Sequence, residues 1–179
     1  MECYKEFPRR VGLLTSLAGA AYAMAGIALT LAVSPWLAAG FVVLLLFVQL
    51  FHYPRSACVH CYYFDRTCVS FKGKLAARLY KRGEEAAFPR GMRRAMLGIW
   101  AIWAYPLAVL ALAQVLGREI YFSDLLLAAV LVVLMVMRQL MRPSLGCRVC
   151  MMREDCPNVG RDPRRPVEVT DRAAARPGG

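Results

Sequence analysis

The chain has 179 residues, the length of one modest domain, but 59% of them are hydrophobic, against roughly 45–50% in ordinary soluble proteins. Charged residues make up 20% of the chain and are almost absent from four long stretches. This distribution excludes a typical soluble enzyme domain, a disordered chain and a secreted disulfide-rich miniprotein. It predicts an all-α integral membrane protein with basic polar segments between its apolar stretches.

The first two apolar stretches predict a helical hairpin over residues 11–53. Residues 11–33 carry no charge, Ser34-Pro35 interrupts them, and residues 36–53 are again uncharged. Each stretch is close to the roughly 20 residues that a helix needs to cross a bilayer core, and neither alternates like a barrel strand. Because the first stretch runs ten residues past the signal-like triplet Ala21-Tyr22-Ala23, we expect a retained helix and not a cleaved signal.

The other two stretches predict a second hairpin over residues 96–141, with spans at 96–117 and 120–141. Charged residues in the last span lie near its ends, where Asp124 follows the turn and Arg138 precedes the polar segment. We expect Arg138 to snorkel to the inner surface, because a long basic side chain near a helix end can reach the headgroups.

The distribution of basic residues predicts the orientation. All but one of the 23 Lys and Arg residues lie before residue 11, in the central loop 54–95, or from residue 138 onward; the exception is Arg118. By the positive-inside rule these segments are cytoplasmic, so we expect a multi-pass inner-membrane protein with both termini in the cytoplasm. The net charge of +11 then reflects this topology and attraction to an anionic inner leaflet, and not nucleic-acid binding.

Two cysteine triads indicate an internal duplication. Cys58-x-x-Cys61 and Cys68 follow the first hairpin, and matching cysteines recur 89, 89 and 88 residues later as Cys147, Cys150 and Cys156. Prolines 54 and 143 are also 89 apart, and each is expected to break its helix just before the cysteines. The chain therefore reads as two tandem hairpin repeats of the same orientation, related by a pseudo-twofold axis along the membrane normal.

Small residues indicate where the helices pack, because they allow close approach in lipid. In the first helix they are spaced alternately four and three apart, at Gly12, Ser16, Gly19, Ala23, Gly26 and Thr30. In the third helix a similar stripe is formed by Ala101, Ala104, Ala108 and Ala111. We expect both stripes to face other helices.

The polar segments have different expected roles. Residues 71–82 of the central loop place apolar side chains four apart among basic ones, which predicts a short basic amphipathic helix on the inner leaflet; a solvated basic loop is the alternative. Residues 1–10 form a cytoplasmic N-terminus, and residues 142–157 form the second cysteine segment. Residues 158–179 have little apolar content and are expected to be disordered.

The cysteines are the residues with the clearest chemical role. Disulfides do not persist in the cytoplasm, so metal ligation and a cycling dithiol compete, and the C-x-x-C spacing favours metal ligation. Zinc and iron both accept four thiolates in tetrahedral geometry. Two equivalent C-x-x-C turns would meet near the pseudo-axis and supply one four-thiolate set, made of Cys58, Cys61, Cys147 and Cys150.

The third cysteines, Cys68 and Cys156, allow several interpretations. Each triad could hold its own ion, completed in the first half by His60 or His52, or the cysteines could bind an iron–sulfur cluster, although the spacing differs from that of ferredoxins. They could equally be buried small apolar residues. Cys3 is assigned no role.

These features lead to two functional hypotheses. The first is a four-helix inner-membrane protein with a cysteine-ligated metal centre at its cytoplasmic face, either structural zinc or iron–sulfur. The second is a membrane redox protein that passes electrons or thiol equivalents between a cytoplasmic redox or assembly partner and a lipid-soluble carrier. No phosphate-binding loop, dinucleotide turn, nucleophile elbow or His-Glu-x-x-His motif is present.

Overall fold

The computed structural model describes residues 6–119, 121–145, 150–152 and 156, and no β-strand occurs among them. The long helices are α1 (Arg9–Val33), α2 (Pro35–Leu46), α5 (Phe88–Val115) and α6 (Phe122–Leu145). Shorter elements are the π-helix η1 (Phe47–His52), α3 (Tyr53–Ser56), the 3₁₀-helix η2 (Cys58–His60), α4 (Lys72–Leu79) and the 3₁₀-helix η3 (Glu85–Ala87). The chain is therefore all-helical over its described part, as predicted.

Four helical segments are long and apolar enough to cross a membrane: Arg9–Val33, Pro35–His60, Glu85–Val115 and Phe122–Leu140. Many of their large apolar side chains point outward, and Trp36 and Phe122 are more than 80% exposed. Such a surface is expected where lipid replaces water as the solvent. The prediction of four spanning helices is confirmed at this level.

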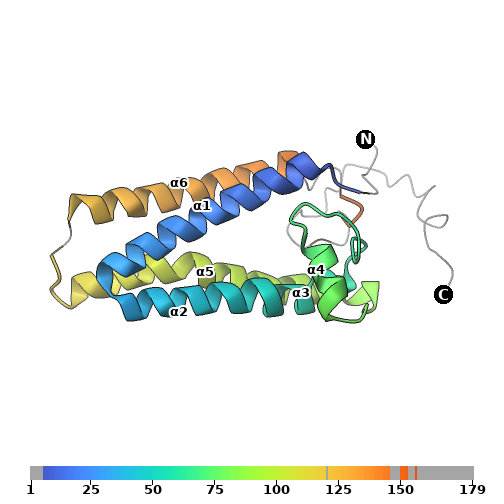
Figure 1. The fold of residues 1–179 in the computed structure, drawn as a ribbon, viewed down its shortest axis with the longest axis horizontal. Coiled ribbons are helices and arrows are strands. Elements are labelled where there is room, and N and C mark those ends of the chain that lie inside the picture. Colours follow the sequence, from blue (N-terminus) through green and yellow to red (C-terminus); the bar gives the residue numbers. More distant parts are fainter. Residues whose placement is uncertain (1–5, 120, 146–149, 153–155, 157–179) are drawn as a thin grey trace.

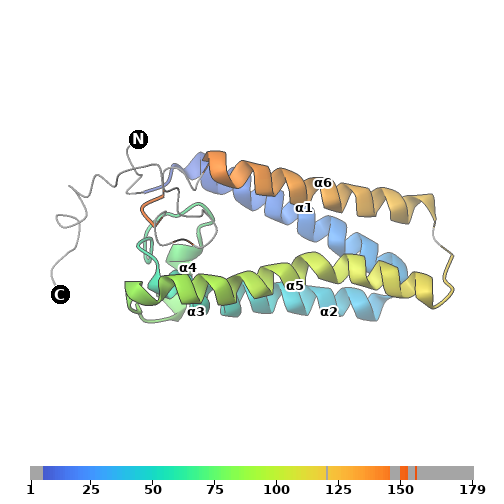
Figure 2. The same cartoon turned by 180° about the vertical axis from the view of Figure 1, so that it is seen from behind.

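Helix α1 crosses the bundle diagonally and joins its two sides. Figures 1 and 2 show α1 beside α6 at the end where the N-terminus lies, and beside α2 and α5 at the opposite end. Helix α1 packs against each of the other three long helices, whereas α5 and α6, although consecutive, make little contact over the described residues. The second hairpin is therefore open, and α1 fills the space between its arms.

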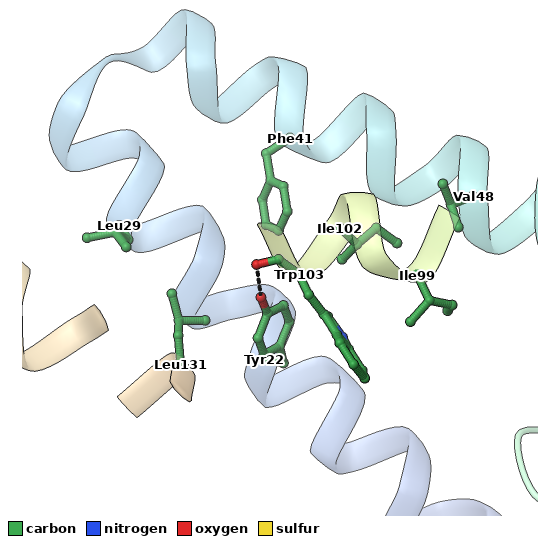
Figure 3. Packing of buried hydrophobic residues seen from close by; sticks show 8 residues of the cluster. All are labelled: Tyr22, Leu29, Phe41, Val48, Ile99, Ile102, Trp103 and Leu131. Atoms are coloured by element: carbon green, nitrogen blue, oxygen red, sulfur yellow. Dashed lines mark hydrogen bonds between the residues drawn. The ribbon is translucent and has the colours of Figure 1, made fainter. Parts of the chain in front are cut away.

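The buried core joins these helices near the middle of the bundle (Figure 3). It consists of Tyr22, Leu29, Phe41, Val48, Ile99, Ile102, Trp103 and Leu131. The Tyr22 hydroxyl donates a hydrogen bond of 3.1 Å to the Trp103 carbonyl oxygen, so the polar atom of this buried phenol is satisfied. Van der Waals packing of this kind is the main source of helix association in lipid.

Contrary to the prediction, the two prolines do not break their helices. Helix α2 passes through η1 into α3, which contains Pro54, and Pro143 lies inside α6. The π-helical turn before Pro54 provides the reason: a wider turn makes room for the ring and supplies i→i+5 bonds, such as that from the Tyr53 N–H to the Val48 oxygen. The second helical path therefore continues to the first cysteine turn.

The alanine stripe of α5 was predicted to face other helices, but it faces outward. Ala101, Ala104, Ala108 and Ala111 are exposed. Helix α5 instead approaches its neighbours at Gly91 and Gly98, two buried glycines that lie seven residues apart in the sequence. A Cβ at Gly91 would overlap the Ser56 carbonyl oxygen. In α1 the predicted stripe is largely buried, because Gly12, Gly26 and Thr30 are inside and only Ser16 is exposed.

Residues 57–87, which we name the cysteine loop, fold back onto the bundle end. The predicted helix is present as α4, which packs one face against α3 and η2, with Gly73 and Ala76 buried. The segment before α4 lies against α1: the Thr15 hydroxyl donates to the Val69 oxygen, and the Phe71 ring lies on Gly12. The loop is thereby fixed to α1.

Candidate functional site

Three cysteines of the cysteine loop occupy two consecutive turns. Cys58 begins η2, directly after α3, and the Cys61 N–H donates to the Cys58 carbonyl oxygen at 3.2 Å, closing the C-x-x-C turn. A second turn follows, in which the Phe71 N–H donates to the Cys68 carbonyl oxygen at 3.3 Å. All three side chains are buried or partly buried free thiols.

Backbone N–H groups point at two of the sulfur atoms. The Gly73 N–H donates to the Cys68 Sγ at 3.4 Å. At Cys61 burial raises the pKa of the thiol well above its usual value, and a backbone hydrogen bond from Tyr63 opposes this with a smaller lowering effect. The N–H donors are of the kind that stabilise a thiolate, which is the form that binds metals, although at Cys61 burial favours the thiol.

The electrostatic environment of Cys61 shows which other thiols lie near it. Besides burial, neighbouring thiols raise its pKa, because their negative charges would repel a Cys61 thiolate; these neighbours are Cys150, Cys58 and Cys68. Cys150 follows α6 and is remote from the other three in sequence. The fold therefore brings four thiols from two segments into one region.

The segment carrying Cys150 is held against the cysteine loop by Tyr63. The Met151 N–H donates to the Tyr63 hydroxyl at 3.1 Å, and Met152 is buried. The Tyr63 ring also packs on Phe7 at a centroid distance of 5.2 Å, and the Phe7 N–H donates to the Thr67 oxygen. Figure 1 shows residues 150–152 beside the cysteine loop and near the start of α1.

The two histidines lie toward α5 and are held by backbone carbonyls. The His60 Nδ1 is 2.8 Å from the Glu84 oxygen, and its ring lies against Gly83 and Gly91. The His52 Nε2 is 2.9 Å from the Arg94 oxygen, and its ring lies against Gly98. The expected role of these histidines as a fourth ligand has no support in this geometry, which favours a role in helix packing.

Lys72 is a member of the site that sequence reasoning did not single out. Its ammonium donates to the Gln49 side-chain oxygen, lies 4.2 Å from the centre of the Tyr53 ring, and interacts electrostatically with Cys58. Gln49 is a polar residue inside a predicted apolar stretch, and Lys72 is one of several basic residues of the predicted amphipathic helix, so the sequence does not pair them. Their proximity depends on the folding-back of the cysteine loop. A cation at this position would offset part of the charge of a thiolate formed beside it.

The remaining predicted ligands are Cys147 and Cys156. Cys147 lies outside the described residues, as does Cys3, to which no role was assigned, and Cys156 is partly buried. Within the described part of the chain, no three His, Cys, Asp or Glu side chains are arranged so that they could hold a metal ion. The thiols are therefore neighbours without being positioned around one common point.

Comparisons with other proteins provide no further assignment. No protein-family profile, curated protein or solved structure is significantly similar to this chain. The function must be inferred from the site alone.

Proposed function

We propose that this chain is a four-helix inner-membrane protein that carries a cysteine-ligated metal centre at its cytoplasmic face. The orientation rests on the positive-inside rule, since all but one of the basic residues lie, in the sequence, before residue 11, between residues 54 and 95, or from residue 138 onward. The repeat of the two cysteine triads in sequence supports an origin by duplication. The partners of this face are the anionic inner leaflet and a cytoplasmic redox or assembly protein.

The observation that carries the proposal is the convergence of four thiols around Cys61. We assign the ligands as Cys58, Cys61, Cys68 and Cys150, because these are the thiols that influence one another. A zinc ion bound by these four residues would require each sulfur at ~2.3 Å from the metal. This set differs from the sequence prediction in that Cys68 takes the place of Cys147.

The centre would act as a clamp between the two halves of the chain. Three ligands follow the first hairpin and one follows the second, so a bound metal would fix the segment after α6 against the cysteine loop. Binding free energy at such a site is also folding free energy, since the preformed site does not exist in the unfolded chain. Zinc would act only as this clamp, whereas an iron–sulfur cluster could also transfer electrons.

The test is the metal content of anaerobically purified full-length protein. We expect stoichiometric zinc in a colourless sample, or broad visible absorption from iron–sulfur. Single replacements of the assigned ligands by serine should each remove most of the metal, whereas Cys3→Ser, the matched control, should retain it. A double variant should lose little more than a single one, because ligands of one centre act as a unit.

Two further variants decide the ligand set. Loss of metal in Cys68→Ser with retention in Cys147→Ser supports our assignment, and the opposite result supports the set predicted from sequence. A loss of half the metal in each single variant indicates one ion per triad. Protein that contains no metal and takes up none from added Zn²⁺ overturns the metal centre.

The second candidate is a redox protein that passes electrons or thiol equivalents to a lipid-soluble carrier. The observation that favours it is the proximity of Cys61 and Cys150, two cysteines on different segments. Under this alternative, alkylation of metal-free protein would show these two thiols lost together on oxidation and recovered together on reduction.

A further inference from the structure

Three exposed arginines lie on one side of the contact between α3 and α5. The two helices are antiparallel, since α2 leads into α3 at the end with the cysteine loop, and α5 begins there and runs back (Figures 1 and 2). At their contact Ser56 of α3 lies on Gly91 of α5. Arg55 and Arg90 each precede one of these contact residues by one position, and equal offsets in an antiparallel pair turn both side chains to the same side. Arg94, one turn after Arg90, extends this arginine row along α5.

The positive charges of the arginine row are not balanced by acidic side chains. Over the described part of the chain, none of the ion pairs involves an arginine of the row, and the nearby Glu85 pairs with Arg82. The His52 Nε2 atom lies 2.9 Å from the Arg94 carbonyl oxygen, which holds α5 against the helical path that carries Arg55. A guanidinium presents five N–H donors in a planar fork that fits the oxygen atoms of a phosphate. The row therefore has the charge and the donors to bind a phosphate group.

The arginine row continues directly into an apolar, outward-facing surface. Phe51 lies one turn before Arg55 and is 52% exposed, and Leu97 lies about one turn after Arg94 and is 69% exposed. Ala101 follows on the same face of α5, is exposed, and leaves room at the helix surface because its side chain is small. The basic and apolar surfaces are thus continuous, which suits a ligand that has both a phosphate and hydrocarbon chains.

The length of the helix that carries most of the row places it at the depth of the lipid headgroups. The segment Glu85–Val115 has 31 residues, about 46 Å at about 1.5 Å per residue, whereas a bilayer core is about 30 Å thick. About ten of its residues therefore extend beyond the core. Its charged residues all lie among residues 85–94, so this is the end that extends.

We propose that Arg55, Arg90 and Arg94 bind the phosphate of one anionic phospholipid, whose acyl chain lies along the exposed surface at Ala101. Basic positions between membrane helices on the cytoplasmic side are the usual sites for such headgroups. A general attraction to an anionic leaflet would not single out these residues, whereas a specific site would. The bound lipid would contact helices from both halves of the chain beside the Ser56–Gly91 contact. Only the choice of leaflet rests on the orientation proposed above, and the metal centre is not involved.

The test measures the binding of phosphatidylglycerol to purified full-length protein in detergent by native mass spectrometry. We expect Arg55→Gln and Arg90→Gln each to weaken the tightest bound lipid about fivefold, the usual contribution of one basic residue at an anionic lipid surface. Arg55→Lys should lose less, because it keeps the charge and loses only the fork. The matched control is Arg78→Gln, which removes the same charge from an exposed position of α4. It should change the affinity less than about twofold, the precision of the measurement.

The other outcomes would overturn the proposal. Equal binding by wild type, Arg55→Gln and Arg90→Gln overturns the site, and an equal loss in Arg78→Gln shows a general charge effect and overturns its specificity. Phosphatidylcholine at the same concentration should not be retained, and millimolar inorganic phosphate should not displace phosphatidylglycerol; displacement overturns the assignment to lipid. Unchanged helical circular dichroism separates lost binding from misfolding. Titration after treatment with a chelator should give the same affinity, so failure of the metal centre leaves this result unaffected.

Discussion

At the scale of single residues, the cysteine loop depends on two backbone positions in the left-handed region. Asp65 has φ of 60° and Phe71 has φ of 56°, although neither is glycine. Asp65 tolerates this conformation better than most residues, and its N–H donates to the Gly73 oxygen at 3.2 Å, which ties the segment between Cys61 and Cys68 to α4. Phe71 is fixed in place because its ring lies on Gly12 of α1.

Replacement of Asp65 tests this reading. Asp65→Gly should change the free energy of unfolding by less than about 0.5 kcal/mol, because glycine adopts this φ freely but gains entropy in the unfolded chain. Asp65→Val should destabilise by about 1–2 kcal/mol, because a β-branched residue is strained there. Thermal unfolding in detergent measures both changes.

The matched control is Glu84→Val. Glu84 is also exposed in the cysteine loop but has an ordinary extended backbone with φ of −73°, which valine adopts readily. Equal destabilisation by valine at the two positions would contradict the role of backbone strain at Asp65.

At the scale of elements, the contact between α3 and α5 supports the first cysteine turn. Ser56 ends α3 two residues before Cys58, and its carbonyl oxygen lies directly on Gly91 of α5. The contact is made by backbone atoms of both helices, so no flexible side chain could move to make room for a larger residue at position 91. The position of Cys58 is therefore set by a helix that belongs to the second half of the chain.

Gly91→Ala should therefore destabilise the protein by about 1–3 kcal/mol, the usual cost of overpacking, and should reduce metal retention with it. Gly19→Ala is the matched control, because the nearest atom to its Cβ is the flexible Arg138 guanidinium at 3.5 Å, an ordinary contact. The melting temperatures of the two variants in the same detergent provide the comparison. Equal melting temperatures would show that the α3–α5 contact is looser than described.

At the scale of the whole molecule, the polar ends of the bundle differ in charge and in structure. One end carries the cysteine loop and the start of α1, and the other carries the short connections after α1 and α5 (Figures 1 and 2). Among the residues that the structure describes, the second end contains a single basic residue, Arg118, whose Nη2 atom lies 3.9 Å from Oδ2 of the buried Asp124. The charge asymmetry predicts the cytoplasmic placement of the first end.

This placement is tested with two exposed positions in a background without other reactive cysteines. A membrane-impermeant thiol reagent should label Ser123→Cys in intact cells, and should label Glu84→Cys only after the membrane is permeabilised. The reverse pattern would contradict the orientation, and the metal centre would then lie in an oxidising compartment where disulfides are favoured.

Several properties follow from sequence because they depend on local composition. The four spanning helices follow from long uncharged stretches, since a backbone in lipid must form its own hydrogen bonds. The C-x-x-C turn at Cys58 and Cys61 also follows from sequence, because its two cysteines are only three residues apart. The buried stripe of α1, including Gly12 and Gly26, was recognised because its spacing matches the helical period over several turns.

Only the tertiary structure decided which of these elements are neighbours. A helical period identifies a face but not its partner, so the alanine stripe of α5 and the glycine pair Gly91 and Gly98 look alike in sequence, and only the second is buried. The proximity of Cys68 and Cys150 to Cys61, and of Arg138 to Gly19, arises from non-local packing: the folding-back of the cysteine loop and the diagonal course of α1. Such contacts are selected by the fit of the whole bundle, because in lipid van der Waals packing, and not local hydrophobicity, determines which helix surfaces meet.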